Sequence, residues 1–305
     1  MITALAAVAF WVGQLGLERA WAHTDGSGVT VAVLDTGVDP DHADLAGAVL
    51  PGAEFPDLGS GARDASGHGT SVAALIAGRS GVAPGARVLP VKVTGGSADA
   101  TEALTWAVDR GARVVNLSLG GGTGSFDEGL LYAAEHDVVV VVAAGNTGTD
   151  AGVTALARGE HVVAVSAVDR EGRFREDVSV SGPEVVLAAP GVDVPTSRGE
   201  RSGTSYAAAL VFGAVALVRA EHPDLDAVEV VELLTSTARD AGPPGRDAEY
   251  GFGVVDPARA LEEGPPGGGG VWWWSAVALV PLGVWAAWRA RGRRTRCHAR
   301  GRRTR

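Results

Sequence analysis

Short runs rich in valine recur along this chain, and they constrain its fold more than any other feature. The runs are apolar and β-branched, as in residues 29–34, 138–144 and 161–168. Such runs are typical of strands that are buried on both faces of a parallel sheet. Segments with helical spacing separate them. We therefore expect an α/β fold, a three-layer sandwich built around a mainly parallel sheet.

Predicted strands and helices alternate through most of the chain. We expect strands at 29–34, 87–93, 113–119, 138–144, 161–168 and 184–189, and helices at 71–77, 98–110, 126–136, from 204 onward, at 226–238 and from 257. Asp99 and Asp226 are candidate caps of the helices that they open. Residues 50–66 are rich in glycine, proline and aspartate, so we expect a surface loop there.

Chemically reactive side chains stand where these elements begin or end. Asp35 follows the first strand, His68 opens a helix, and Ser205 stands in the first turn of another. Sites in open α/β sheets form at the carboxyl ends of strands. The free N–H groups and the dipole at a helix start also favour a developing anion. Each residue alone is more often a cap or turn residue, but together they supply a nucleophile, a base and an orienting acid.

Six motifs around these residues resemble those of the subtilisin family, and they occur in that family's order. They lie at 33–38 around the acid, 67–73 around the histidine, 82–86 in the turn that follows, 116–120 in the substrate-binding strand, 143–146 at the oxyanion position and 203–208 around the serine. The resemblance covers residues 15–262. It implies a serine endopeptidase of polypeptides that acts through an acyl-enzyme.

The same resemblance implies a role for each matched residue. Asp35, His68 and Ser205 match the catalytic triad, and Asn146 matches the side-chain donor to the oxyanion. Two further segments match the strand that pairs with extended substrate and the wall of an uncharged S1 pocket, which favours small or apolar P1 residues. These substrate-binding residues are Ser118, Leu119 and Gly120 in the strand and Ala143, Ala144 and Gly145 in the pocket. No cofactor or metal is expected, and structural calcium stays open because no ligand spacing stands out.

Two other kinds of chemistry fit the sequence less well. Asp35-Thr36-Gly37 also matches an aspartic-protease triplet, but the second triplet needed to share a proton does not occur. Residues 120–124 are rich in glycine like a phosphate loop, yet no Gly-Lys-Ser/Thr follows them.

The C-terminal residues have the pattern of a membrane anchor. Residues 263–270 form a Gly/Pro linker, and residues 271–288 carry no charge and have tryptophans at both ends. Eighteen residues span about 27 Å as a helix, close to the thickness of a bilayer. Nine arginines follow within residues 289–305. The positive-inside rule predicts one transmembrane helix, a cytoplasmic tail and a peptidase domain outside the cell membrane.

Residues 1–14 are apolar but lack the basic start of a signal peptide. We consider two alternatives for them, a truncated or mis-started signal sequence and a short helix packed on the domain.

Charge and cysteine content limit the partners. Before the arginine tail, 17 basic residues face 36 acidic ones, a net charge of −19, which disfavours nucleic-acid binding by the domain. The tail is basic enough to bind nucleic acid, but membrane topology is the simpler explanation. Cys297 is the only cysteine, so the chain forms no internal disulfide.

The predicted anchor makes the chain resemble one branch of the family, the membrane-anchored mycosins associated with type VII secretion. That resemblance implies a type VII secretion complex as a partner. Two features depart from the branch: Ala209 stands where proline is usual, and the disulfides frequent in mycosins are impossible. The alternative function is a membrane scaffold of a secretion complex that has the same subtilisin-like fold and in which catalysis is dispensable.

Overall fold

A parallel sheet is the centre of this computed structural model, which describes residues 10–56, 63, 64, 66–94, 97–117 and 126–265. The sheet has seven strands in the order β2-β3-β1-β4-β5-β6-β7, and every neighbouring pair is parallel. Its strands are β1 Thr30–Asp35, β2 Ala53–Phe55, β3 Arg87–Val93, β4 Val114–Leu117, β5 Val139–Ala143, β6 Val162–Val168 and β7 Val185–Pro190. The α/β class with a mainly parallel sheet is confirmed.

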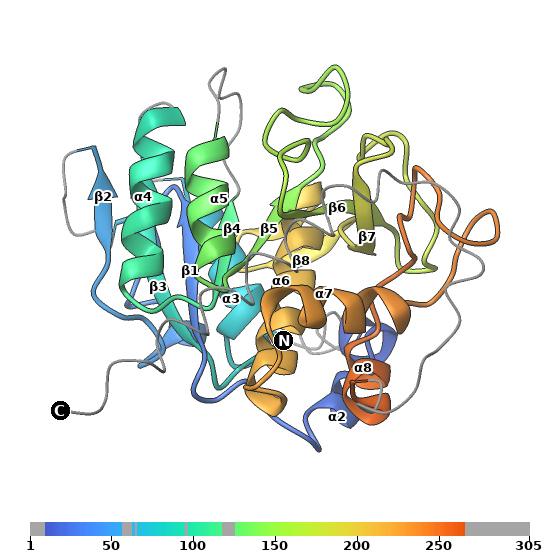
Figure 1. Ribbon diagram of the computed structural model, residues 1–305, viewed down its shortest axis with the longest axis horizontal. Helices are drawn as coiled ribbons and strands as arrows, with labels where there is room; N and C mark the ends of the chain where they lie inside the picture. The colour runs from blue at the N-terminus through green and yellow to red at the C-terminus, as the bar shows by residue number, and fades with distance from the viewer. Residues whose placement is uncertain (1–9, 57–62, 65, 95–96, 118–125, 266–305) are drawn as a thin grey trace, which may run out of the picture. The chain divides into compact units, whose positions relative to one another are not determined.

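Helices pack in two groups against this sheet (Figure 1). The helices are α2 Leu17–Ala20, α3 His68–Ala77, α4 Ser97–Asp109, α5 Asp127–Glu135, α6 Thr204–Glu221, α7 Ala227–Ser236 and α8 Pro257–Glu263, with a 3₁₀ turn η1 at Ala43–Leu45. Helices α4 and α5 contact each other, as do α3 and α6, and both groups contact the strands. Helices therefore cover both faces of the sheet, the arrangement typical of α/β folds with a mostly parallel sheet.

Strand β1 is buried on both faces of the sheet. Ala32 and Leu34 belong to the apolar cluster that includes Leu104 of α4 and Leu130 of α5. Val33, between them, points to the opposite face and is equally buried. The valine-rich runs therefore form strands that are covered on both sides.

Helix α6 crosses the core of the domain and places Ser205 at its first turn. Among the described residues it is the one helix long and apolar enough to cross a membrane, but 89% of it is buried inside the fold. The anchor predicted at 271–288 and the tail at 289–305 lie outside the described residues. Chain contacts divide the molecule into the units Met1–Pro265 and Pro266–Arg305.

The N-terminal stretch packs on the domain from residue 10 onward. Residues 10–14 are helical, and the side chains of Trp11 and Leu15 are buried. Helix α2 contacts α8, and Arg19 forms an ion pair with Glu262 at 2.9 Å. This is the arrangement of the second alternative, a short helix on the domain, for the part of residues 1–14 that is described.

Most predicted elements are confirmed to within one or two residues, and the exceptions are short. Asp226 caps α7 in a capping box with Glu229, as predicted for the cap. The surface loop predicted at 50–66 is wrong at 53–55, where β2 pairs with β3 at the edge of the sheet. The cap predicted at Asp99 is also wrong, because α4 begins at Ser97 and Asp99 lies inside its first turn. An antiparallel hairpin, β8 Val194–Thr196 with β9 Gly199–Arg201, was not predicted.

Candidate active site

Three elements bring Asp35, His68 and Ser205 into one line of contacts. Asp35 is the last residue of β1, His68 the first of α3, and Ser205 the second of α6. The His68 Nδ1 atom lies 2.8 and 2.9 Å from the two Asp35 carboxylate oxygens, and Nε2 lies 2.9 Å from Ser205 Oγ. Side chains 33 and 137 residues apart in the chain therefore touch through one imidazole ring.

Asp35 fixes the state of the imidazole. Its side chain is fully buried, whereas 31% of the His68 side chain is exposed. A carboxylate only accepts hydrogen bonds, so the proton on the neutral ring sits on Nδ1 and the lone pair on Nε2 faces Ser205. Burial lowers the pKa of His68, but the hydrogen bond and charge of Asp35, helped by the charge of Asp64, outweigh burial and raise it. The ring is therefore placed to accept the hydroxyl proton of Ser205.

Gly69 permits the close approach of α3 to the end of β1. A Cβ atom at this position would lie 2.2 Å from the Gly37 carbonyl oxygen and 3.0 Å from Asp35 Cβ. Any side chain here would push the first turn of α3, and with it His68, away from Asp35. The glycine after His68 is thus a steric requirement of the contact between acid and base.

Asn146 follows β5 and its side-chain amide has a fixed orientation. Its Oδ1 atom accepts hydrogen bonds from the Thr204 backbone N–H at 2.8 Å and from the Thr204 hydroxyl at 3.1 Å. A backbone N–H is only a donor, so the atom facing it must be the amide oxygen. The Nδ2 donors are consequently available to another acceptor.

Neutral polar groups border the space beside the Ser205 hydroxyl. The N–H groups of a first helical turn have no acceptor within the helix, and Ser205 is in such a turn. A Cβ at Gly203 would lie 3.3 Å from Asn146 Oδ1 and 3.7 Å from Ser205 Oγ, so the glycine keeps this space open. The amide of Asn146 and the backbone of Ser205 can thus serve one oxygen of a bound carbonyl.

The predicted substrate-binding residues have different places. Ser118, Leu119 and Gly120 lie outside the described residues, directly after β4, which runs between β1 and β5. Ala143 is half-buried at the end of β5, while Ala144 is buried in the apolar cluster. The Gly145 N–H donates to the Thr204 hydroxyl at 3.3 Å. The role of all six in binding substrate stays a prediction.

Two residues that support the site were not predicted from the sequence. Thr204 holds the Asn146 amide, and Asp64 accepts hydrogen bonds from the turn that begins α3. The only sequence signal was proximity, since Thr204 precedes Ser205 and Asp64 stands four residues before His68. Thr and Asp at helix starts are ordinary caps, so that signal was not distinctive.

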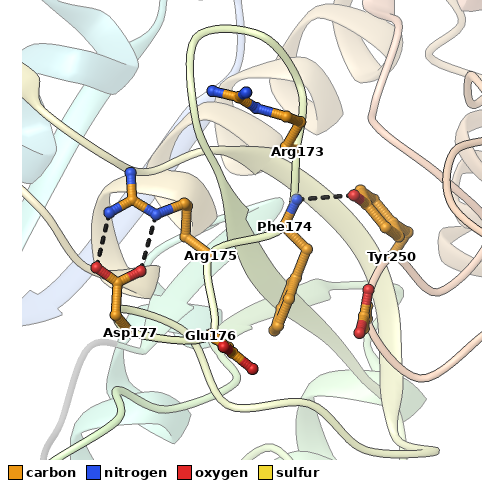
Figure 2. A pocket seen from close by; sticks show the side chains of 7 residues that line it. Arg173, Phe174, Arg175, Glu176, Asp177 and Tyr250 are labelled. Carbon is orange, nitrogen blue, oxygen red and sulfur yellow. Dashed lines mark hydrogen bonds and ion pairs between the residues drawn. The ribbon is translucent and has the colours of Figure 1, made fainter.

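A separate hollow of about 420 Å³ lies between the 173–177 loop and Tyr250, and Figure 2 shows its lining. Arg175 pairs with Asp177 at 2.7 Å, and the Phe174 N–H donates to the Tyr250 hydroxyl at 2.7 Å. Arg173 pairs with Asp169 and Glu171 outside the wall, and no candidate site residue lines the hollow. In the described part of the chain, no cluster of three or more His, Cys, Asp or Glu side chains suits a metal ion.

Comparisons with known proteins agree on one family. A family model described as the subtilase family, peptidase S8, matches residues 26–253. A thermostable alkaline protease of Halalkalibacterium halodurans is 38% identical over 255 residues, which cover 78% of this chain and 68% of that protein. Mycosin-3 of Mycobacterium tuberculosis is 31% identical over 332 residues, which cover 81% of this chain and 70% of the mycosin.

Solved structures give the same result. The MycP3 protease from the type VII (ESX-3) secretion system superposes with a TM-score of 0.70 at 34% identity, over 83% of this chain and 87% of that one. The identities to the alkaline protease and to the two mycosins span only 31–38%. Sequence identity alone therefore does not separate a mycosin from other members.

Proposed function

The chain belongs to the subtilase family of serine endopeptidases, and from that premise we propose that Asp35, His68 and Ser205 are its catalytic triad. The observation that supports this most is the unbroken line of contacts of 2.8–2.9 Å from carboxylate to imidazole to hydroxyl. Serine at its ordinary pKa is a weak nucleophile, so it needs a base at this distance.

Each residue then has one task in peptide hydrolysis. Ser205 Oγ attacks the scissile carbonyl carbon while His68 Nε2 takes the hydroxyl proton. Asp35 stabilises the imidazolium that forms, without itself taking the proton. The tetrahedral intermediate collapses to an acyl-enzyme when His68 gives its proton to the leaving amine. Water then attacks the ester carbonyl carbon while His68 takes a proton from it. His68 gives that proton to Ser205 Oγ as the acid product leaves.

Asn146 and the Ser205 backbone N–H stabilise the oxyanion of both tetrahedral intermediates. The support is the amide orientation imposed by Thr204, which leaves Nδ2 free to donate. Preorganised donors of this kind act where charge develops in the transition state, and so they raise kcat rather than ground-state affinity.

Residues 118–120 and 143–145 bind substrate on the acyl side of the scissile bond. The first segment directly follows β4 in the chain, and β4 lies beside β1, which carries Asp35; this segment pairs with extended substrate backbone. The second carries no charge, and this favours small or apolar P1 side chains. Products cleaved from an unbiased peptide library, identified by mass spectrometry, would show this preference directly.

Hydrolysis by the full-length chain tests the triad. We expect wild type to degrade unfolded casein and the Ser205→Ala variant to lose about 10⁶-fold in kcat. A thermal unfolding curve matching wild type would show that the variant is folded. Equal rates for the two proteins would remove Ser205 from the mechanism.

We also propose that residues 271–288 anchor the enzyme in the cell membrane, with the arginine tail inside and the peptidase domain outside. The similarity to mycosin-3 and to MycP3 adds a working context, the processing of type VII secretion components. Polypeptides released by such a system would then meet the active site on the outer face of the membrane.

The single cysteine offers a test of this topology. Cys297 falls in the tail, so a membrane-impermeant maleimide should label it only after the cells are permeabilised. A control with Ser197→Cys in a Cys297→Ser background should be labelled in intact cells, because position 197 is exposed on the domain. Labelling of Cys297 in intact cells would overturn the orientation.

A further inference from the structure

A second carboxylate, Asp64, ties the start of α3 to its surroundings. Its Oδ1 atom accepts the Gly67 N–H at 2.7 Å and the Ser66 N–H at 3.1 Å, and its Oδ2 atom accepts the Thr70 N–H at 2.8 Å. These N–H groups flank His68 on both sides. One carboxylate thus accepts from two donors, the Gly67 and Thr70 N–H groups, that the start of a helix leaves without intrahelical acceptors.

Thr36 connects this carboxylate to the buried acid of the triad. Its hydroxyl oxygen lies 2.8 Å from Asp64 Oδ1 and 3.1 Å from Asp35 Oδ1, and its backbone N–H donates to Asp35 at 2.7 Å. The same hydroxyl accepts the Gly69 N–H at 3.1 Å. Because Gly69 directly follows His68, this hydrogen bond ties the first turn of α3 to the residue that follows β1.

We propose that Asp64 is a positioning residue for His68, acting through Thr36 and the first turn of α3 to hold the imidazole between Asp35 and Ser205. This inference rests on the proposed triad and extends it with a residue that touches neither substrate nor the reacting atoms.

The negative charge of Asp64 also affects the protonation of the His68 imidazole. Burial raises the pKa of Asp64, but its hydrogen bonds with Thr70, Thr36 and Gly67 outweigh burial and lower it, so the group is ionised at neutral pH. Its negative charge favours the protonated form of His68, in the same direction as Asp35.

The other groups facing His68 act differently. The Tyr206 ring of α6 lies 5.7 Å from the imidazole, centroid to centroid, and burial is the main cause that raises the pKa of Tyr206, so the phenol is neutral. The Arg198 guanidinium of the β8–β9 hairpin donates to the Ser66 carbonyl beside the same turn. This cation opposes the two carboxylates, so loss of Asp64 changes the balance of charge around the ring.

The acid limb of the pH profile depends on the protonation of His68. General-base catalysis needs neutral His68, so kcat/KM falls when the ring is protonated at low pH. Removing the Asp64 charge makes protonation less favourable and moves the acid limb of the pH profile to lower pH. A helix cap with only a structural role would leave that limb where it is.

The test is the pH dependence of kcat and kcat/KM for the full-length Asp64→Asn variant on a chromogenic peptide. We expect the acid limb to move to lower pH and kcat at its plateau to fall by about 10–100-fold, since small displacements of a base cost rates of this order. The control is Asp39→Asn, a nearby acid whose side chain accepts from the Asp41 N–H and not from the histidine turn. We expect wild-type kcat and an unmoved limb for it.

A second variant keeps the inference testable if Asp64→Asn does not fold. Thr36→Val keeps both carboxylates but removes the hydroxyl between them, so kcat should fall while the acid limb stays near its wild-type position. Wild-type kcat in either folded variant, or an unmoved limb in folded Asp64→Asn, would overturn the inference. An inactive wild type would instead overturn the proposed triad.

Discussion

The two halves of the proposed active site are built in opposite ways. The proton-transfer half, formed by Asp35, His68 and Asp64, is charged and rich in hydrogen bonds to buried or half-buried carboxylates. The oxyanion half, formed by Asn146, Thr204 and the Ser205 N–H, consists of neutral groups whose orientation is fixed by one backbone donor and one hydroxyl.

This difference follows from what each half must do. A base must keep its protonation state and position, and both depend on nearby charge. A donor to an oxyanion needs only to point at the right place before the charge appears. Changes in the first half should therefore alter the pH dependence of the rate, whereas changes in the second should lower kcat at every pH.

The largest effect expected in the oxyanion half is that of Asn146→Ala. It removes the Nδ2 donor, so kcat should fall by about 10²–10³-fold with the acid limb of the pH profile unmoved. Steady-state kinetics from acid to alkaline pH measure both. Thr147→Ala, an exposed neighbour whose hydroxyl donates to the Glu176 carbonyl, is the matched control and should behave as wild type. A displaced acid limb in Asn146→Ala would break the division between the halves.

A smaller effect should come from Gly69→Ala in the proton-transfer half. The added methyl group clashes with the Gly37 carbonyl, so overpacking should lower the free energy of unfolding by about 1–3 kcal/mol and reduce kcat. Urea denaturation and kinetics would measure the two losses. Gly13→Ala is the control, because this helical glycine has nothing within 4 Å of an added Cβ and alanine favours helix there. Equal stability of the two variants would show that the close approach is not required.

The smallest effect should come from Thr204→Val in the oxyanion half. The hydroxyl's bonds with Asn146 Oδ1 and with the Gly145 N–H are both lost, but the backbone N–H of residue 204 still holds the Asn146 oxygen. The orientation of Asn146 therefore loses one hydrogen bond, worth about 1 kcal/mol or about fivefold in kcat. Thr204→Ser keeps the hydroxyl and should retain most activity. If Thr204→Val cost as much as Asn146→Ala, the hydroxyl would carry more of the orientation than the geometry indicates.

Sequence patterns predicted six of the seven strands of the sheet, because each of the six is a mostly buried apolar run. They also placed Asp35, His68 and Ser205 at ends of elements, and a parallel sheet gathers such ends at one edge. What they did not predict is short or non-local. Strand β2 and the β8–β9 hairpin have three-residue strands, too short to show a period.

The supporting residues escaped prediction for another reason. Asp64 lies in a stretch rich in glycine and aspartate, the composition of an exposed loop, and nothing local indicates that its carboxylate meets Thr36 from another element. Thr204 has the position of an ordinary helix start. Asp and Thr commonly cap helices. Only a contact with a residue distant in the sequence therefore distinguishes a residue that supports the active site from an ordinary cap.

Covalent labelling tests the central claim most directly, namely that His68 activates Ser205 as the nucleophile. The full-length chain is treated with a fluorophosphonate, and the adduct is located by peptide mass spectrometry in wild type, Ser205→Ala and His68→Ala. We predict one adduct on Ser205 in wild type, none in Ser205→Ala and strongly slowed labelling in His68→Ala. A folded wild type that takes no label, or takes it on another residue, would contradict the account and favour a scaffold without catalysis.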